Sequence, residues 1–97
     1  AIKDNIKRVI PSNLYAEIDL KKIKVLKVFK WLKNYNIRDK EMLKTFNCGV
    51  GFCLIINRKN LNKVIKCFSN KYKPYVIGEI TSRKSKVKFK NEITWSP

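Results

Sequence analysis

The sequence contains no histidine, and only three cysteines, three glycines and three prolines among its 97 residues. A catalytic triad that depends on histidine, or a zinc site that uses it, is therefore impossible within these residues. Cys48, Cys53 and Cys67 have neither CxxC nor Cys/His metal spacing, and their odd number without a secretion signal indicates reduced, cytosolic thiols. We expect Cys53 to be a small core residue, and Cys48 lacks a histidine to activate it as a nucleophile.

Long apolar runs are also missing. The longest, Val50 to Ile56, is far shorter than the roughly 18 residues that a membrane-spanning helix needs, and no stretch resembles a signal peptide. We therefore expect no membrane association and a cytoplasmic location. The chain begins at Ala1 without an initiator methionine, and its length suits a single domain, or a fragment of one, over residues 1–97.

Acidic residues are scarce, with 7 against 23 basic ones, so that the formal net charge is +16. Such an excess is compatible with nucleic-acid binding through counterion release. However, nearly all of the basic residues are lysines spread over every segment, whereas base edges and phosphates favour the planar guanidinium of arginine. A lysine-coated surface is the simpler interpretation, and a nucleic-acid interface stays open as the alternative.

Hydrophobic periodicity predicts alternating helices and strands. In chain order we expect a helix over 1–10, a strand over 14–20, helices over 24–35 and from about 39, a strand over 50–56, a helix after Asn57, and strands over 75–81 and around 87–89. The strand over 50–56 is apolar on both faces and should be central, whereas the last strand is flanked by lysines and should lie at an edge. The fold class is therefore α+β: a layered α/β sandwich with a mixed sheet of partial ferredoxin-like topology, in which the helix after Asn57 packs on the sheet.

The stretch TFNCGVGF, residues 45–52, joins a short helix to the strand expected to be central. Its two glycines allow a tight corner, which would place Asn47 at a cleft at the mouth of the sheet. The same residues are also typical of an ordinary helix C-terminus, in which Gly49 is left-handed and Asn47 satisfies loose carbonyls. The spacing alone leaves both interpretations open.

Two further pairs of polar residues share a face of their predicted element. Asn5 and Arg8 are three apart on a helix and could together bind a phosphate or carboxylate, although an ordinary solvated pair has the same spacing. Glu17 and Asp19 share one face of a strand and could hold a metal or act as acid and base. An edge strand with one solvated face explains these two carboxylates more simply.

Five short motifs carry a resemblance to a known family. They are DNIKRVIP (4–11), AEID (16–19), FKWL (29–32), EMLKTFNCGVG (41–51) and VIGE (76–79). In this order and spacing they resemble the end of the phosphoribosylformylglycinamidine cyclo-ligases, also called aminoimidazole ribonucleotide synthetases. The resemblance covers nearly the whole chain, and TFNCGxG is its most specific part.

The resemblance implies a fragment of the larger C-terminal domain of an enzyme of de novo purine biosynthesis, which closes the imidazole ring of formylglycinamidine ribonucleotide using ATP and Mg²⁺. It implies that Asn5 and Arg8 contact the phosphate or ribose of the substrate, and that Asn47 and the Gly49 backbone line the cleft. Catalytic residues and metal ligands are not assigned. The enzyme's own N-terminal domain would supply most nucleotide and metal contacts and the homodimer interface, so we expect the fragment to be inactive alone.

The resemblance is incomplete at two places. A glycine-rich segment that precedes the first helix in the family is absent before Ala1, and Lys7 and Phe52 replace the family's usual proline and methionine.

A small basic RNA-binding α+β module is the alternative function, because the residues from Gly49 to Phe52 resemble the aromatic strand motif of such modules. That motif needs aromatic rings at alternate positions, and here Leu54 and Ile56 occupy them.

Overall fold

The computed structural model describes residues 2–82 and 87–95. Four α-helices, α1 (Ile2–Val9), α2 (Lys27–Lys33), α3 (Asp39–Thr45) and α4 (Leu61–Lys66), accompany three strands, β1 (Tyr15–Asp19), β2 (Gly78–Thr81) and β3 (Val87–Lys90). Three short 3-10 helices lie between them: η1 (Leu20–Lys22), η2 (Arg58–Asn60) and η3 (Asn70–Tyr72). The predicted α+β class is confirmed.

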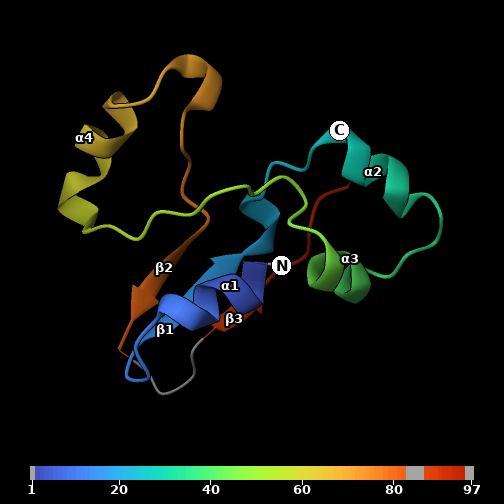
Figure 1. Cartoon of the computed structure of the whole chain (residues 1–97), viewed down its shortest axis with the longest axis horizontal. Helices are drawn as coiled ribbons and strands as arrows, with labels where there is room; N and C mark the ends of the chain where they lie inside the picture. The colour runs from blue at the N-terminus through green and yellow to red at the C-terminus, as the bar shows by residue number, and fades with distance from the viewer. Residues whose placement is uncertain (1, 83–86, 96–97) are drawn as a thin grey trace.

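The strands form one sheet in the order β2-β1-β3. β1 is antiparallel to β2, with Tyr15 opposite Thr81, and parallel to β3, with Ala16 opposite Val87, so the sheet is mixed as predicted. β3 lies at an edge and carries lysines, which also agrees with the prediction. β1 is the central strand of this sheet (Figure 1). The interpretation of Glu17 and Asp19 as residues of an edge strand is therefore wrong.

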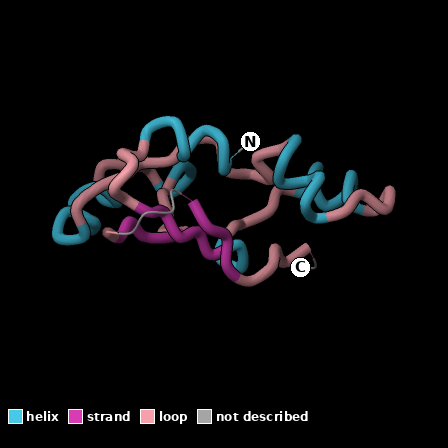
Figure 2. The backbone as a smooth tube through the Cα atoms, turned by 90° about the horizontal axis from the view of Figure 1, so that it is seen from below, coloured by secondary structure: helices cyan, strands magenta, loops and turns pink. Residues whose placement is uncertain are grey.

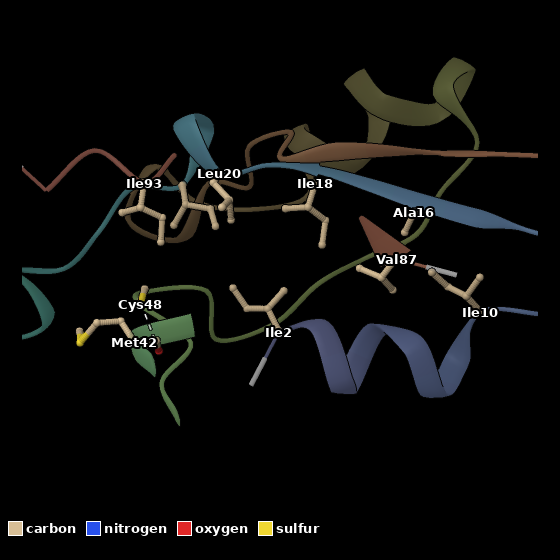
Figure 3. Close-up of a cluster of buried hydrophobic side chains, with 10 residues drawn as sticks. Ile2, Ile10, Ala16, Ile18, Leu20, Met42, Cys48, Val87 and Ile93 are labelled. Atoms are coloured by element: carbon tan, nitrogen blue, oxygen red, sulfur yellow. Dashed lines mark hydrogen bonds between the residues drawn. The ribbon is translucent and has the colours of Figure 1, made fainter. Parts of the chain in front are cut away.

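The hydrophobic core lies between α1 and one face of the sheet. Ala16 and Ile18 alternate with Glu17 along β1, and both are buried, because period-two alternation directs them to the same face. Figure 3 shows Ile2 of α1, and Ile10 just after its end, on the opposite side of this core, and Figure 2 shows α1 lying above the strands. The core also contains Leu20, Ile23, Met42, Cys48, Val87 and Ile93. This packing fixes the position of α1 over the sheet.

The segment over 50–56 is not a strand, so the prediction of a central strand there is wrong. None of these residues belongs to the sheet, and residues 51–56 are exposed, with Phe52 86% accessible. An apolar run becomes a strand only where a neighbouring strand accepts its backbone hydrogen bonds. Among the described residues β1 is paired on both sides, and β2 and β3 pair only with β1, so no strand accepts this run. Cys53 in this segment is exposed, so its assignment to the core is also wrong.

The helix after Asn57 forms, but it does not pack on the sheet as expected. The principal contacts of α4 with other described elements are with η2 (Figure 1). Because the segment before α4 forms no strand, no layer of sheet extends beneath this helix. Asn57 accepts a hydrogen bond from the Lys59 N–H at 3.1 Å and is therefore the N-cap of the helical segment that η2 begins.

Two further contacts hold the sheet and the tail. A Cβ atom on Gly78 would lie 2.1 Å from the carbonyl oxygen of Glu17, so the backbone of β1 lies very close to this glycine. Trp95 packs against the core. None of the described helices is long and apolar enough to cross a bilayer.

Candidate functional site

A sharp corner follows α3. The Phe46 N–H donates to the Met42 carbonyl at 2.9 Å and ends the helix, and the backbone then turns through positive φ values of 55° at Cys48 and 119° at Gly49. The Asn47 Oδ1 accepts a hydrogen bond from the Gly49 N–H at 3.1 Å. The helix-C-terminus interpretation is therefore right that Gly49 has a positive φ, but Cys48 shares this property. It is wrong about Asn47, whose side chain accepts from an N–H group instead of satisfying a carbonyl.

Glycine is required at position 49 by both its backbone angle and its surroundings. A Cβ there would lie 2.7 Å from the Lys24 carbonyl oxygen and 3.2 Å from the Leu26 backbone nitrogen. The corner is thus pressed against the chain that leaves η1, and only a residue without a side chain allows this approach. This contact fixes the corner that carries the exposed Asn47.

A hollow of about 250 Å³ lies between α1 and the segment that includes the corner. One wall comes from α1 and the other from the end of α3 and the residues after it. The lining residues are Ile2, Asn5, Ile6, Thr45, Asn47, Val50, Gly51, Phe52 and Cys53. Pockets for whole small molecules usually measure about 300–1,000 Å³, so this hollow has room for one part of such a ligand.

The polar groups of the hollow are neutral. Asn5 and Asn47 supply side-chain amides, and Thr45 supplies a hydroxyl. Amide and hydroxyl groups can donate hydrogen bonds to phosphate or sugar oxygens. No carboxylate lines the hollow, and the described residues contain no group of three acidic or cysteine side chains that could hold a metal. These residues do not fit Mg²⁺, which prefers carboxylate oxygens.

The residues predicted for the site do not all meet. Asn5 and Asn47, 42 positions apart, line the same hollow from opposite walls. Arg8 is exposed on α1 and is not a lining residue, so its contact with a ligand stays a prediction. Gly49 lies outside the lining, and its N–H group is already bound to Asn47.

Some lining residues were not predicted. Thr45 and Gly51 belong to the most specific motif and could have been found by extending the site along it. Phe52 could not, because it was assigned to a buried strand, and its position at the hollow follows from the absence of that strand.

The cysteines of this region have different surroundings. Cys48 is fully buried, with its Sγ 3.8 Å from the Met42 carbonyl oxygen, and it does not line the hollow. Burial, with a smaller effect from Asp39, raises the pKa of the Cys48 thiol, which disfavours the nucleophilic thiolate. Cys48 therefore serves the packing of the corner, whereas the exposed Cys53 borders the hollow.

The carboxylates of β1 have structural partners. Glu17 pairs with the Lys90 Nζ at 3.3 Å, and Asp19 accepts hydrogen bonds from the Asn91 Nδ2 at 2.9 Å and the Lys21 N–H at 3.1 Å. The bond from Asn91 is the main cause that lowers the pKa of Asp19. Neither carboxylate lines the hollow, and the metal or acid–base interpretation gains no support from these contacts.

Comparisons with known proteins match this sequence to one family. Residues 2–90 match the family described as "AIR synthase related protein, C-terminal domain". A curated relative, the "Trifunctional purine biosynthetic protein adenosine-3" of Chironomus tentans, is 45% identical over 82 residues, which cover 84% of this chain. The chain spans about 6% of the length of that relative. Neither comparison points to an RNA-binding module.

Proposed function

The chain belongs to the AIR synthase related protein family, as part of its C-terminal domain, and from this premise we propose that it contributes to an ATP-dependent ring-closing ligase of de novo purine biosynthesis. The substrate is formylglycinamidine ribonucleotide and the product is aminoimidazole ribonucleotide. The five motifs of the sequence support this assignment, as does the purine biosynthetic relative. The proposed location is the cytoplasm.

One observation carries the proposal for the site. Asn5 on α1 and Asn47 at the corner line one hollow, and both side chains end in amides. A ribonucleotide presents phosphate and ribose oxygens, which accept hydrogen bonds from such groups. We assign the hollow to the ribose-phosphate part of the substrate, with Thr45 as a further donor.

The role of these residues in the reaction is to hold and orient the ribonucleotide. In the proposed reaction ATP phosphorylates the formyl oxygen, the amidine nitrogen attacks the formyl carbon, and phosphate leaves. Fixing the ribose-phosphate limits the motion of the substrate, which brings the amidine and formyl groups closer to their reactive arrangement. The chain's own residues supply position and hydrogen bonds, and no step is assigned to a metal here.

The size of the hollow argues that other parts of the protein complete the site. A volume of about 250 Å³ is smaller than a whole-nucleotide pocket. We propose that the N-terminal domain supplies the remaining ATP and Mg²⁺ contacts and the homodimer interface. The 97-residue chain alone should therefore show no ring closure.

The test is steady-state kinetics on the protein that contains this chain. Asn5→Ala removes a hydrogen bond to a charged ligand, which is worth about 1.5–3 kcal/mol, so KM for the ribonucleotide should rise about 10- to 150-fold. Asn62→Ala is the matched control, because Asn62 is an exposed asparagine on α4 outside the lining of the hollow. An unchanged KM in Asn5→Ala would overturn the assignment of the hollow.

Arg8 is tested separately, because it is exposed and does not line the hollow. It follows Asn5 by three positions on α1, and we propose that its guanidinium meets the phosphate at the mouth of the hollow. Arg8→Ala should lower activity in the same assay. Unchanged turnover and Michaelis constants in this variant would remove Arg8 from the site.

A further inference from the structure

Residues from α2, from α3 and from the tail after β3 meet at one carboxylate, at the end of α3 that is far from the hollow. The Trp95 Nε1 donates a hydrogen bond to the Asp39 Oδ1 at 3.0 Å, and the Lys33 Nζ lies 2.8 Å from the same oxygen. The Lys33 Nζ also lies 5.6 Å from the centre of the Trp95 ring. The tail after β3 thereby reaches α2 and α3 (Figure 1). We name Lys33, Asp39 and Trp95 the tail latch.

The tail latch holds the first residue of a helix whose other end borders the hollow. α3 begins at Asp39 and ends at Thr45, which lines the hollow together with Asn47. A helix of seven residues has little stability of its own in water, so its orientation depends on tertiary contacts. In its middle, α3 is held by Met42, which is fully buried.

At its start, α3 follows an exposed turn that contains Asn36 at a φ of 63°. The Lys33 Nζ also donates to the Ile37 carbonyl oxygen and so ties α2 across this turn. Trp95 is the one member of the tail latch that comes from outside the α2–α3 region. Its hydrogen bond to a carboxylate is of the stronger, charge-assisted kind.

We propose that Trp95 is a positioning residue for the hollow. By holding Asp39, it sets the tilt of α3 about the buried Met42, and thus how far Thr45 and Asn47 stand from Asn5. The family match ends at residue 90, so Trp95 lies outside the matched part. What the hollow binds rests on the proposed function, whereas the link between the tail and α3 does not.

The tail should stay folded when the indole N–H group is removed. Ile93 is buried in the core and anchors the tail independently of Trp95. Trp95→Phe keeps an aromatic ring beside Lys33 but cannot donate to Asp39. Trp31→Phe is the matched control, because Trp31 is exposed and its ring contact is with Tyr35 at 5.3 Å.

The first measurement is hydrogen exchange in the protein that contains this chain, and it needs no substrate. Trp95→Phe should speed the exchange of α3 amides about two- to tenfold relative to Trp31→Phe and should leave the α1 amides unchanged. This is what one hydrogen bond is worth when solvent screens its carboxylate, and the Asp39 side chain is 40% exposed. Equal α3 exchange in the two variants would overturn the link between the tail and α3. This result is independent of the fate of the proposed function.

The second measurement separates positioning from general destabilisation. Trp95→Phe should raise KM for the ribonucleotide about two- to tenfold and leave KM for ATP unchanged. It should add no further effect in an Asp39→Ala background, which already lacks the acceptor for the indole N–H. Faster α3 exchange with an unchanged ribonucleotide KM, equal changes in both KM values, or effects that add to those of Asp39→Ala would each overturn the positioning role. If Asn5→Ala leaves KM unchanged while α3 exchange responds to Trp95→Phe, the proposed function fails and the tail latch stands.

Discussion

Asn47 is the residue at which structural and binding roles can be separated most sharply. Its Oδ1 accepts a hydrogen bond from the Gly49 N–H at 3.1 Å, so this oxygen is engaged within the corner. The amide nitrogen remains as the group that can donate to a ligand in the hollow. Asn47→Asp keeps the acceptor but replaces the donor with a negative charge, whereas Asn47→Ala removes both groups.

The two substitutions should therefore rank in opposite orders for stability and for binding. Asn47→Ala loses one exposed neutral hydrogen bond and should cost about 0.5–1 kcal/mol of unfolding free energy, whereas Asn47→Asp should cost less. In binding, Asn47→Ala loses about 1.5–3 kcal/mol of interaction with a phosphate. Asn47→Asp also adds repulsion between like charges, about 4 kcal/mol at 4 Å in a partly screened site.

The assay pairs urea unfolding with the ribonucleotide KM of the protein that contains this chain. KM should rise about 10- to 150-fold in Asn47→Ala and further in Asn47→Asp, while the unfolding midpoint should fall more in Asn47→Ala. Asn62→Asp adds the same charge on the exposed face of α4 and should change neither quantity. A wild-type KM in Asn47→Asp, or the same order of the two variants in both assays, would refute the reasoning.

Three further outcomes follow from the fold. Gly78→Ala should lower the unfolding free energy by about 2 kcal/mol or more in urea, because the new Cβ would lie 2.1 Å from a carbonyl oxygen of β1; an unchanged midpoint would contradict this close contact. The hydrogen bond from Asn91 lowers the pKa of Asp19, so its contribution is present above the ordinary value of 3.8 and is lost as the pH falls through the folded-state pKa. Asp19→Asn should therefore flatten the loss of stability in acid, and an identical acid limb would argue against a lowered pKa. A thiol reagent should modify the exposed Cys53 rapidly and the fully buried Cys48 only after unfolding, and equal native rates would show that Cys48 is accessible.

The local elements followed from short-range patterns where packing agreed with them. The apolar spacing of Ile2, Ile6 and Ile10 predicted α1, because a helix buries such a stripe on whatever face covers it. The run over 50–56 shows where the same reasoning fails. Its apolar residues satisfy the pattern of a central strand, but a strand needs neighbours that are set by pairing over long sequence distances.

The sequence predicted only part of the candidate site, because short motifs identify suitable side chains but not which of them packing brings together. The motif around Asn47 and the pair of Asn5 and Arg8 identified side chains suited to a ribonucleotide, and the hollow includes both asparagines. Arg8 and Gly49 lie outside the lining of the hollow. Whether a residue lines the hollow depends on the direction in which its groups face after the chain has packed. No motif indicated the contact between Trp95 and Asp39, which are 56 positions apart.

Composition and motif order were enough to establish the α+β class, the absence of histidine chemistry and the family of this chain. These properties depend on which residues are present and on their local spacing, so the linear chain already contains them. The sheet order β2-β1-β3, the exposure of Phe52 and the meeting of Asn5 with Asn47 came from packing. Contacts between distant residues form when they lower the free energy of the whole folded chain. No local sequence pattern determines that total.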